Sequence, residues 1–220
     1  MSQKYKHIIW DWNGTLFNDV HLCNDIVNNL LEKNGIAPLS LQTYREIFTF
    51  PIKNYYIEAG FDFSKTSFEI LGREFMDEYE RRKTEAAIFN NVRDILEFVK
   101  GRGLTQSILS AYVQNVLEEF VEYFKIRDYF IGLAGLDNIY AESKIEIGKK
   151  WIEKLRYDEK DILLIGDTKH DFEAAEALGV DCVLVTTGHQ SQKRLEECGV
   201  KVFDSLESVK DYFSPNDELN

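Results

Sequence analysis

The sequence has few cysteines and no metal-thiolate motif. Its 220 residues include only Cys23, Cys182 and Cys198, and no two of these form a CxxC pair. An odd number of widely separated cysteines argues against both a disulfide framework and a zinc site. Because unpaired thiols persist in a reducing compartment, we predict a cytoplasmic protein.

Proline and long apolar runs are also scarce. Three prolines leave little room for rigid, extended linkers, which favours compact helices and strands. The apolar run near the N-terminus, residues 7–10, ends at Asp11 and is far shorter than a signal peptide or a membrane-spanning helix. We therefore expect no interaction with membranes.

Positive charge is in shortage as well. The chain has 26 lysines and arginines against 38 acidic residues, which gives a formal net charge of -12. A nucleic-acid-binding face needs clustered lysine and arginine, so nucleic acid is not an expected partner. An anionic substrate would need local compensation from a lysine, a helix N-terminus or a metal ion.

Short apolar segments alternate with helical patterns along much of the chain. The segments that favour β-strands are residues 7–10, 105–109, 130–133, 162–165, 182–185 and, more weakly, 201–203. Strands that alternate with helices predict an α/β fold with a doubly wound, Rossmann-like parallel sheet. The length fits one such domain with a modest insertion.

The block between residues 18 and 85 shows no convincing strand. It is helical in pattern from residue 40 to residue 83, with breaks near Pro51 and Gly60. One apolar stripe at helical spacing consists of Phe68, Leu71, Phe75 and Tyr79. Such a stripe is typical of a core, so we assign no chemistry to it. We predict a core domain of residues 1–17 and 86–220, and a helical cap domain of residues 18–85.

A cap inserted after the first strand would cover the carboxyl ends of the strands, where open α/β sheets bind ligands. It would close over a substrate and exclude water. Arg45 and Phe50, near the connection between two cap helices, are candidates for substrate specificity.

Three polar residues lie at or near the predicted carboxyl ends of strands. They are Asp11, Ser110 and Asp167. A single strand-end aspartate is usually a turn former or a helix cap. In a parallel sheet, however, all strand ends of this kind meet at one edge, so three such residues predict a shared polar site.

Asp11 is the candidate nucleophile, because a carboxylate can attack phosphorus to form an aspartyl phosphate. Gly14 lets the backbone approach a phosphate, and Thr15 can donate a hydrogen bond. Asp167 and Asp171 add hard oxygen ligands that suit Mg²⁺, which would let two anions meet. Asp171 is also expected to cap a helix that begins at residue 172. By composition alone, Lys144 is a solvated lysine at the start of a helix.

The sequence around these residues resembles the four motifs of the haloacid dehalogenase-like hydrolases. Residues 8–17 resemble the first motif, and Ser110 resembles the second, which holds a phosphate oxygen. Lys144 matches the third motif, and residues 164–171 resemble the acidic fourth motif. The place of the insertion resembles the helical cap of the subgroup that includes phosphoglycolate phosphatases and β-phosphoglucomutases.

The resemblance implies roles for the matching residues. Asp11 would be both nucleophile and Mg²⁺ ligand, and the Asn13 carbonyl and Asp167 would complete the protein ligands. Asp171 would orient Lys144 or a metal-bound water. The implied catalytic set is Asp11, Asn13, Ser110 and Lys144, and the implied phosphate-binding set is Asn13, Gly14, Ser110, Ala111 and Lys144. The implied reaction is Mg²⁺-dependent hydrolysis of a small phosphorylated metabolite, namely a phosphoglycolate-like ester, a sugar phosphate or an acyl phosphate.

The chain departs from the family pattern at Asn13, where related phosphatases usually carry an aspartate that acts as general acid and base. Asparagine cannot transfer that proton. The alternative to a phosphatase is therefore a catalytically weakened protein that binds a phosphorylated ligand or partner. Ile145 also replaces a proline that often follows the lysine of the third motif. Dehalogenation needs no metal and would leave Asp167 and Asp171 without a role. The sequence gives no oligomeric state.

Overall fold

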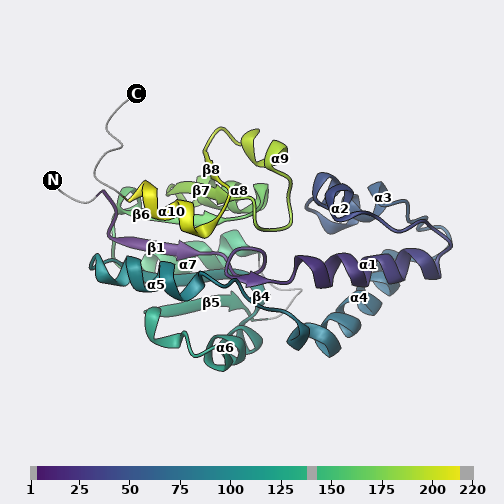
Figure 1. Cartoon of the computed structure of the whole chain (residues 1–220), viewed down its shortest axis with the longest axis horizontal. Helices are drawn as coiled ribbons and strands as arrows, with labels where there is room; N and C mark the ends of the chain where they lie inside the picture. Colours follow the sequence, from purple (N-terminus) through teal and green to yellow (C-terminus); the bar gives the residue numbers. More distant parts are fainter. Residues whose placement is uncertain (1–3, 138–142, 214–220) are drawn as a thin grey trace.

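The computed structural model of the chain describes residues 4–137 and 143–213. Its centre is a six-stranded sheet in the order β5-β4-β1-β6-β7-β8, in which every neighbouring pair is parallel. The strands are β1 His7–Trp10, β4 Thr105–Val113, β5 Gly132–Leu136, β6 Ile162–Gly166, β7 Asp181–Val185 and β8 Lys201–Phe203. This arrangement confirms the predicted α/β fold class (Figure 1).

Helices cover both faces of the sheet. They are α5 Val92–Gly101, α6 Gln114–Tyr123, α7 Lys144–Leu155, α8 Lys169–Leu178, α9 Gln192–Glu196 and α10 Leu206–Tyr212, with short 3₁₀ turns at Lys83–Glu85, Arg127–Tyr129 and Glu159–Asp161. Successive strand residues point to opposite faces. Ile8 and Trp10 of β1 therefore join one hydrophobic cluster with α5, α6 and α10, whereas Ile9 joins a second cluster with α7 and α8.

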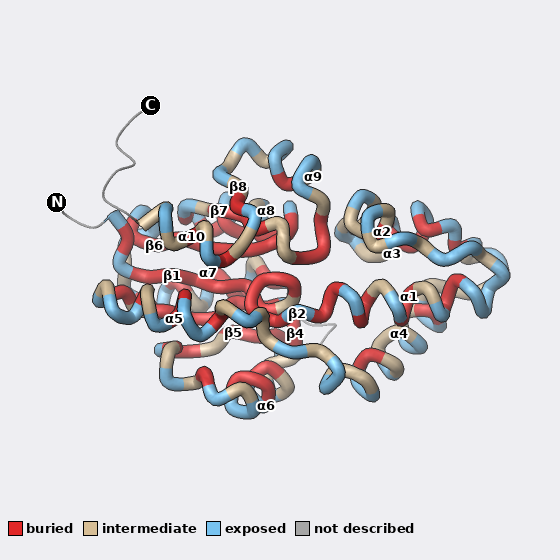
Figure 2. The backbone as a smooth tube through the Cα atoms, viewed as in Figure 1, coloured by how far each residue is buried: buried red, intermediate tan, exposed pale blue. Residues whose placement is uncertain are grey.

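The central strands β1, β4 and β6 are largely buried. All four residues of β1 are buried, as expected for a parallel strand with helices on both sides. Figure 2 shows that the buried residues concentrate in the strands and in the loop that follows β1. Two strand predictions need correction: β4 continues past Ser110 to Val113, and the fifth strand in chain order begins at Gly132.

Four helices lie beyond the end of the sheet, on the right of Figure 1. They are α1 Val20–Lys33, α2 Leu41–Ile47, α3 Ile52–Glu58 and α4 Phe68–Arg82. A two-residue strand, β2 Phe17–Asn18, pairs antiparallel with β3 Ala87–Ile88 where the chain leaves and re-enters the sheet-bearing part. The expectation that no strand lies between the first strand and residue 86 is therefore wrong for Phe17–Asn18, because a two-residue strand carries no readable periodicity. The proposed cap boundary lies at this ribbon.

Among the residues with described positions, no helix is both long and apolar enough to cross a bilayer.

Candidate active site

The carboxyl ends of β1, β4 and β6 meet beneath helices α1–α4, at a cavity of about 470 Å³. Asp11 follows β1, Asp167 follows β6, and Lys144 begins α7. Because β1 lies between β4 and β6, residues more than 150 positions apart along the chain meet at one edge. The predicted site residues that line this cavity are Asp11, Asn13, Phe50, Ser110, Ala111, Lys144, Asp167 and Asp171.

Lys144 joins two of the carboxylates. Its ammonium group donates to Oδ1 of Asp11 and, at 2.5 Å, to Oδ1 of Asp171. All three side chains are buried. Burial alone would lower the pKa of Lys144, but the two carboxylates raise it above its ordinary value. The lysine is therefore a fixed positive charge beside Asp11 and not the solvated lysine that composition alone suggested.

The aspartates carry more negative charge than Lys144 balances. Burial raises the pKa of Asp11 well above its ordinary value, and Asp171 and Asp167 add to this, while Lys144 opposes it. Burial also raises the pKa of Asp167, to about 6. Carboxylate oxygens of Asp11, Asp167 and Asp171 lie within 4.8 Å of one another. Excess buried negative charge on hard oxygen atoms fits a divalent cation such as Mg²⁺.

Asp167 is held by the loops around it. Its Oδ1 accepts a hydrogen bond from the Thr15 hydroxyl (3.0 Å), and its Oδ2 accepts one from the backbone N–H of His189 (2.7 Å). A Cβ atom at Gly188 or at Gly14 would overlap this carboxylate. Gly14 also has φ +77°, which disfavours other residues. Both glycines are thus required for the loops to approach Asp167.

Asp171 lies in the first turn of α8 and takes part in capping that helix as expected, although the expected helix start at residue 172 is wrong. The helix begins at Lys169, one turn earlier. Oδ2 of Asp171 accepts hydrogen bonds from the backbone N–H and the hydroxyl of Thr168 (2.9 and 2.7 Å). Burial opposes the charge of Asp171, but Lys144 and these hydrogen bonds lower its pKa. Asp171 therefore fixes the position of Lys144.

The Asn13 side chain belongs to a buried hydrogen-bond network. Its amide nitrogen donates to Oδ2 of Asp19 (2.8 Å) and to the hydroxyl of Tyr79 (2.9 Å). Tyr79 in turn donates to Asp19, and Nε2 of His189 lies 3.2 Å from the other Asp19 oxygen. Nδ1 of His189 contacts the hydroxyl of Tyr44 at 2.8 Å.

Asp19, Tyr79, Tyr44 and His189 line the cavity, and the sequence did not single them out. Asp19 precedes α1, so it resembles a helix N-cap, yet its side chain makes no capping hydrogen bond. Burial alone would raise the pKa of Asp19, but His189, Asn13 and Tyr79 lower it. No signal in the sequence links positions 19 and 189, because only the fold brings them together.

Three residues that the sequence predicted for the site, Gly14, Arg45 and Ser110, make hydrogen bonds with the protein backbone. The Gly14 N–H donates to the Phe17 carbonyl (2.8 Å), so it is already paired within the loop. Arg45 donates to the carbonyls of Gly188 and Thr187 (2.9 and 3.0 Å) and is not among the described residues that line the cavity. Ser110 lines the cavity, and its Oγ accepts a hydrogen bond from the Tyr112 N–H (3.0 Å).

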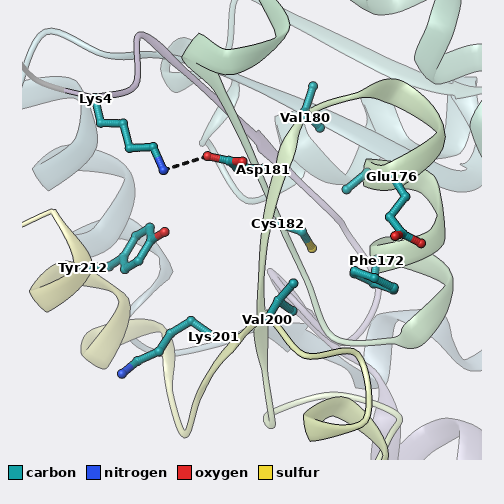
Figure 3. Close-up of a pocket in the computed structure, with 10 residues that line it drawn as sticks. Lys4, Phe172, Glu176, Val180, Asp181, Cys182, Val200, Lys201 and Tyr212 are labelled. Carbon is teal, nitrogen blue, oxygen red and sulfur yellow. Dashed lines mark ion pairs between the residues drawn. The ribbon is translucent and has the colours of Figure 1, made fainter. Parts of the chain in front are cut away.

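A second hollow of about 320 Å³ lies beside β7 and α8. Figure 3 shows Lys4 facing Asp181 there, and the two charged groups are 2.9 Å apart. Of the described residues around it, none belongs to the predicted site. The candidate active site is therefore the cavity at the strand ends.

The family of the chain follows from its sequence. A family model described as haloacid dehalogenase-like hydrolase matches residues 8–185, which is most of the chain. The chain belongs to the haloacid dehalogenase-like hydrolase family, and both the predicted family and the predicted enzyme class are confirmed.

Individual relatives share only a low sequence identity with this chain. A phosphoglycolate phosphatase of Pseudomonas fluorescens (strain Pf0-1) is 23% identical over 210 residues, covering 92% of this chain and 77% of the relative. Phosphoglycolate phosphatase 1 of Pseudomonas aeruginosa is 21% identical over 212 residues, with the same coverage of 92% and 77%.

Solved structures share the fold. A haloacid dehalogenase-like family hydrolase from Streptococcus pneumoniae has a TM-score of 0.80 and 19% identity, covering 97% of this chain and 100% of that one. A predicted phosphoglycolate phosphatase from Haemophilus somnus has a TM-score of 0.75 and 20% identity, again covering 97% and 100%.

Proposed function

We propose that the protein is a Mg²⁺-dependent phosphatase that hydrolyses a small phosphorylated metabolite through an aspartyl phosphate on Asp11. The observation that carries this proposal is the pair of buried contacts that Lys144 makes with Asp11 and with Asp171, with Asp167 alongside, at one end of the cavity. Relatives named phosphoglycolate phosphatase support a phosphorylated substrate. A cytoplasmic location and the cap role of residues 18–85 are part of the same proposal.

In this proposal, an oxygen of Asp11 attacks phosphorus and the ester P–O bond breaks. Lys144 and Ser110 hold the oxygens of the transferring phosphoryl group, and Asp171 keeps Lys144 in place. Asp11, Asp167 and the Asn13 carbonyl would hold Mg²⁺, whose charge lets the anionic nucleophile and phosphate meet. Water then attacks the phosphorus of the aspartyl phosphate, the P–O bond to Asp11 breaks, and inorganic phosphate leaves.

The departing alkoxide needs a proton that Asn13 cannot supply. A good leaving group, such as that of an acyl phosphate or a sugar 1-phosphate, needs least help. The second candidate function is that of a catalytically weakened protein that binds a phosphorylated ligand. One observation favours it: the Asn13 amide nitrogen already donates both of its hydrogen bonds, to Asp19 and to Tyr79. Dehalogenation would leave the charge cluster at Asp167 and Asp171 unused.

The test is phosphate release from a panel of phosphorylated metabolites with Mg²⁺ or with excess EDTA. Asp11→Asn removes the attacking charge while nearly preserving shape, so we expect turnover to fall by roughly 10³-fold or more with the fold intact. Asp62→Asn, at an exposed carboxylate, is the matched control. A phosphoryl or fluoroberyllate adduct should map to Asp11. An adduct on Ser110, or full activity in Asp11→Asn, would contradict the mechanism.

A further inference from the structure

Away from the aspartates, the cavity is lined by aromatic rings. Five of them come from the end of α2 and from α3 and α4: Phe48, Tyr55, Tyr56, Phe68 and Phe75. Neighbouring rings contact one another, with centroids 5.3 Å apart for Phe48 and Tyr55 and 5.7 Å apart for Tyr56 and Phe68. This wall faces the part of the substrate that leaves with the ester oxygen, because the phosphate must lie at Asp11.

Among the described residues that line the cavity, no uncommitted lysine or arginine is available to a charged leaving group. Of the described residues that line it, the basic ones are Lys144, His170 and His189, and none is an arginine. Lys144 is paired with two carboxylates, His189 contacts Asp19, and the His170 ring stacks on Phe50 at 4.6 Å.

Acidic side chains in the cavity also disfavour a negatively charged leaving group. Four carboxylates, those of Asp11, Asp19, Asp167 and Asp171, line the same cavity. A carboxylate on the leaving group would therefore lie against aromatic rings and near like charges, and the described lining offers it no lysine or arginine that is not already paired. Burying an unpaired charge is strongly unfavourable.

We infer that the substrate is a phosphate monoester of an uncharged alcohol that carries an aromatic or bulky apolar group. This inference rests on the proposed phosphatase activity. It predicts a substrate other than phosphoglycolate, which the names of the relatives describe. A cavity of about 470 Å³ is large for a two-carbon acid and fits a ring-bearing group.

The first experiment compares 2-phenylethyl phosphate, ethyl phosphate and 2-phosphoglycolate in the presence of Mg²⁺. The first two leave as primary alkoxides, so a difference between them reports contact with the cavity and not leaving-group chemistry. We expect kcat/KM for the phenylethyl ester to exceed that for ethyl phosphate by roughly 10- to 100-fold. We expect 2-phosphoglycolate to be the poorest of the three.

The outcomes are distinguishable. Hydrolysis that favours 2-phosphoglycolate would overturn the inference while the phosphatase activity stands. No phosphate release from any of the three esters, or from the metabolite panel, would overturn the phosphatase activity and the inference with it.

A charge placed in the cavity provides the second experiment. Gly72 of α4 lines the cavity, and a Cβ there meets no atom within 4 Å. Glycine also weakens a helix interior, so Gly72→Arg should not impair α4. We expect Gly72→Arg to raise kcat/KM for 2-phosphoglycolate roughly tenfold and to lower it for the phenylethyl ester. Phe75→Ala should reduce the phenylethyl preference alone.

Ile57→Arg is the matched control, because Ile57 is an exposed residue of α3 outside the lining. It adds the same charge and should leave the ratio between the esters unchanged. If Gly72→Arg and Phe75→Ala both keep the wild-type ratio, the aromatic wall does not contact the leaving group and the inference is wrong.

Discussion

At the residue scale, the surroundings of Asn13 determine what a substitution there would do. Its amide donates to the Asp19 carboxylate, so an aspartate at position 13 would place two carboxylates in contact. Contact between like charges raises the pKa of one of them, which would then keep a proton near neutral pH. A protonated carboxyl beside the cavity is the group that the proposed reaction lacks.

The pair of substitutions Asn13→Asp and Asp19→Asn tests this reasoning. Exchanging the two side chains restores an amide-to-carboxylate hydrogen bond while placing the carboxyl at position 13. We expect Asn13→Asp alone to gain activity most on ethyl phosphate, up to about 10²-fold, and least on acetyl phosphate. The double variant should gain less, because an amide that donates to the new carboxylate favours its ionised form. Asn13→Asp alone should be less stable by about 1–3 kcal/mol, because it loses a buried hydrogen bond.

The ratio of kcat/KM for the two substrates is the measurement, since better folding alone would raise both equally. Equal changes for the alkyl and acyl substrates would show that position 13 has no role in proton transfer. Some other group would then protonate the leaving oxygen.

Tyr55 gives a prediction about stability. Its hydroxyl is buried and has no hydrogen-bond partner among the described residues, although the ring packs against Tyr44 and Phe48. Tyr55→Phe should leave the free energy of unfolding unchanged or raise it by up to about 1–3 kcal/mol, because an unpaired buried hydroxyl is unfavourable. Tyr79→Phe, which loses contacts to Asp19 and Asn13, should lower it by a similar amount. Urea denaturation measures both, and a clear loss in Tyr55→Phe would contradict the account.

At the scale of single elements, strand β1 contains a titratable residue, His7, in the interior of the protein. His7 is fully buried between β4 hydroxyls, with Nδ1 2.7 Å from Thr105 and Nε2 2.7 Å from Ser107. Burial lowers the pKa of His7 to about 4, from an ordinary 6.5. The central strand of the sheet therefore contains a neutral imidazole at physiological pH.

This shift gives the fold an acid sensitivity with a definite sign. Between about pH 6.5 and pH 4, the unfolded chain binds a proton at His7 and the folded chain does not, so stability falls as pH falls. The full contribution, roughly 3 kcal/mol, is present above pH 6.5 and is lost by about pH 4.

His7→Gln should remove this part of the pH dependence, as measured by urea denaturation at about pH 7 and about pH 4.5. His21→Gln, on the exposed face of α1, should leave it unchanged. An equal loss of stability between the two pH values in wild type and His7→Gln would show that His7 is not the group responsible.

At the scale of the whole molecule, the hydrogen bonds around the cavity join the sheet-bearing part to helices α1–α4. His189, in the loop after β7, contacts Asp19 before α1 and Tyr44 of α2. Arg45 of α2 donates to carbonyls of the same loop. The side chains that close the cavity thus also hold its two sides together, so occupancy of the site and overall stability are expected to be linked.

Mg²⁺ binding should therefore be visible as thermal stabilisation. A cation that binds only the folded chain adds about 2.7 kcal/mol at a concentration 100 times its Kd. For a chain of this size, that corresponds to a Tm increase of roughly 5–10 °C. Asp167→Asn should reduce the increase strongly, whereas Asp181→Asn, beside Lys4 in the second hollow, should keep it. No Tm change with Mg²⁺ in wild type, or an undiminished change in Asp167→Asn, would contradict the proposed metal site.

The sequence by itself determined the fold class and the family. Residues 8–17 and 164–171 lie where buried strands end in polar loops, and such local patterns depend only on short-range periodicity and residue type. The same patterns put Asp11 and Asp167 forward as candidates, and their convergence followed from the rule that parallel strands end at one edge. Lys144 became a candidate only through the family resemblance.

Only the tertiary structure decided which other side chains reach that edge. The sequence predicted nothing for Asp19 or His189 and assigned Tyr79 to a core, yet all three belong to the hydrogen-bond network of Asn13. Arg45 resembled a specificity residue, but its guanidinium is held by backbone carbonyls. The reason is physical: local propensity extends over a few residues, whereas burial, pairing of charges and the chemistry of the cavity depend on contacts between distant segments.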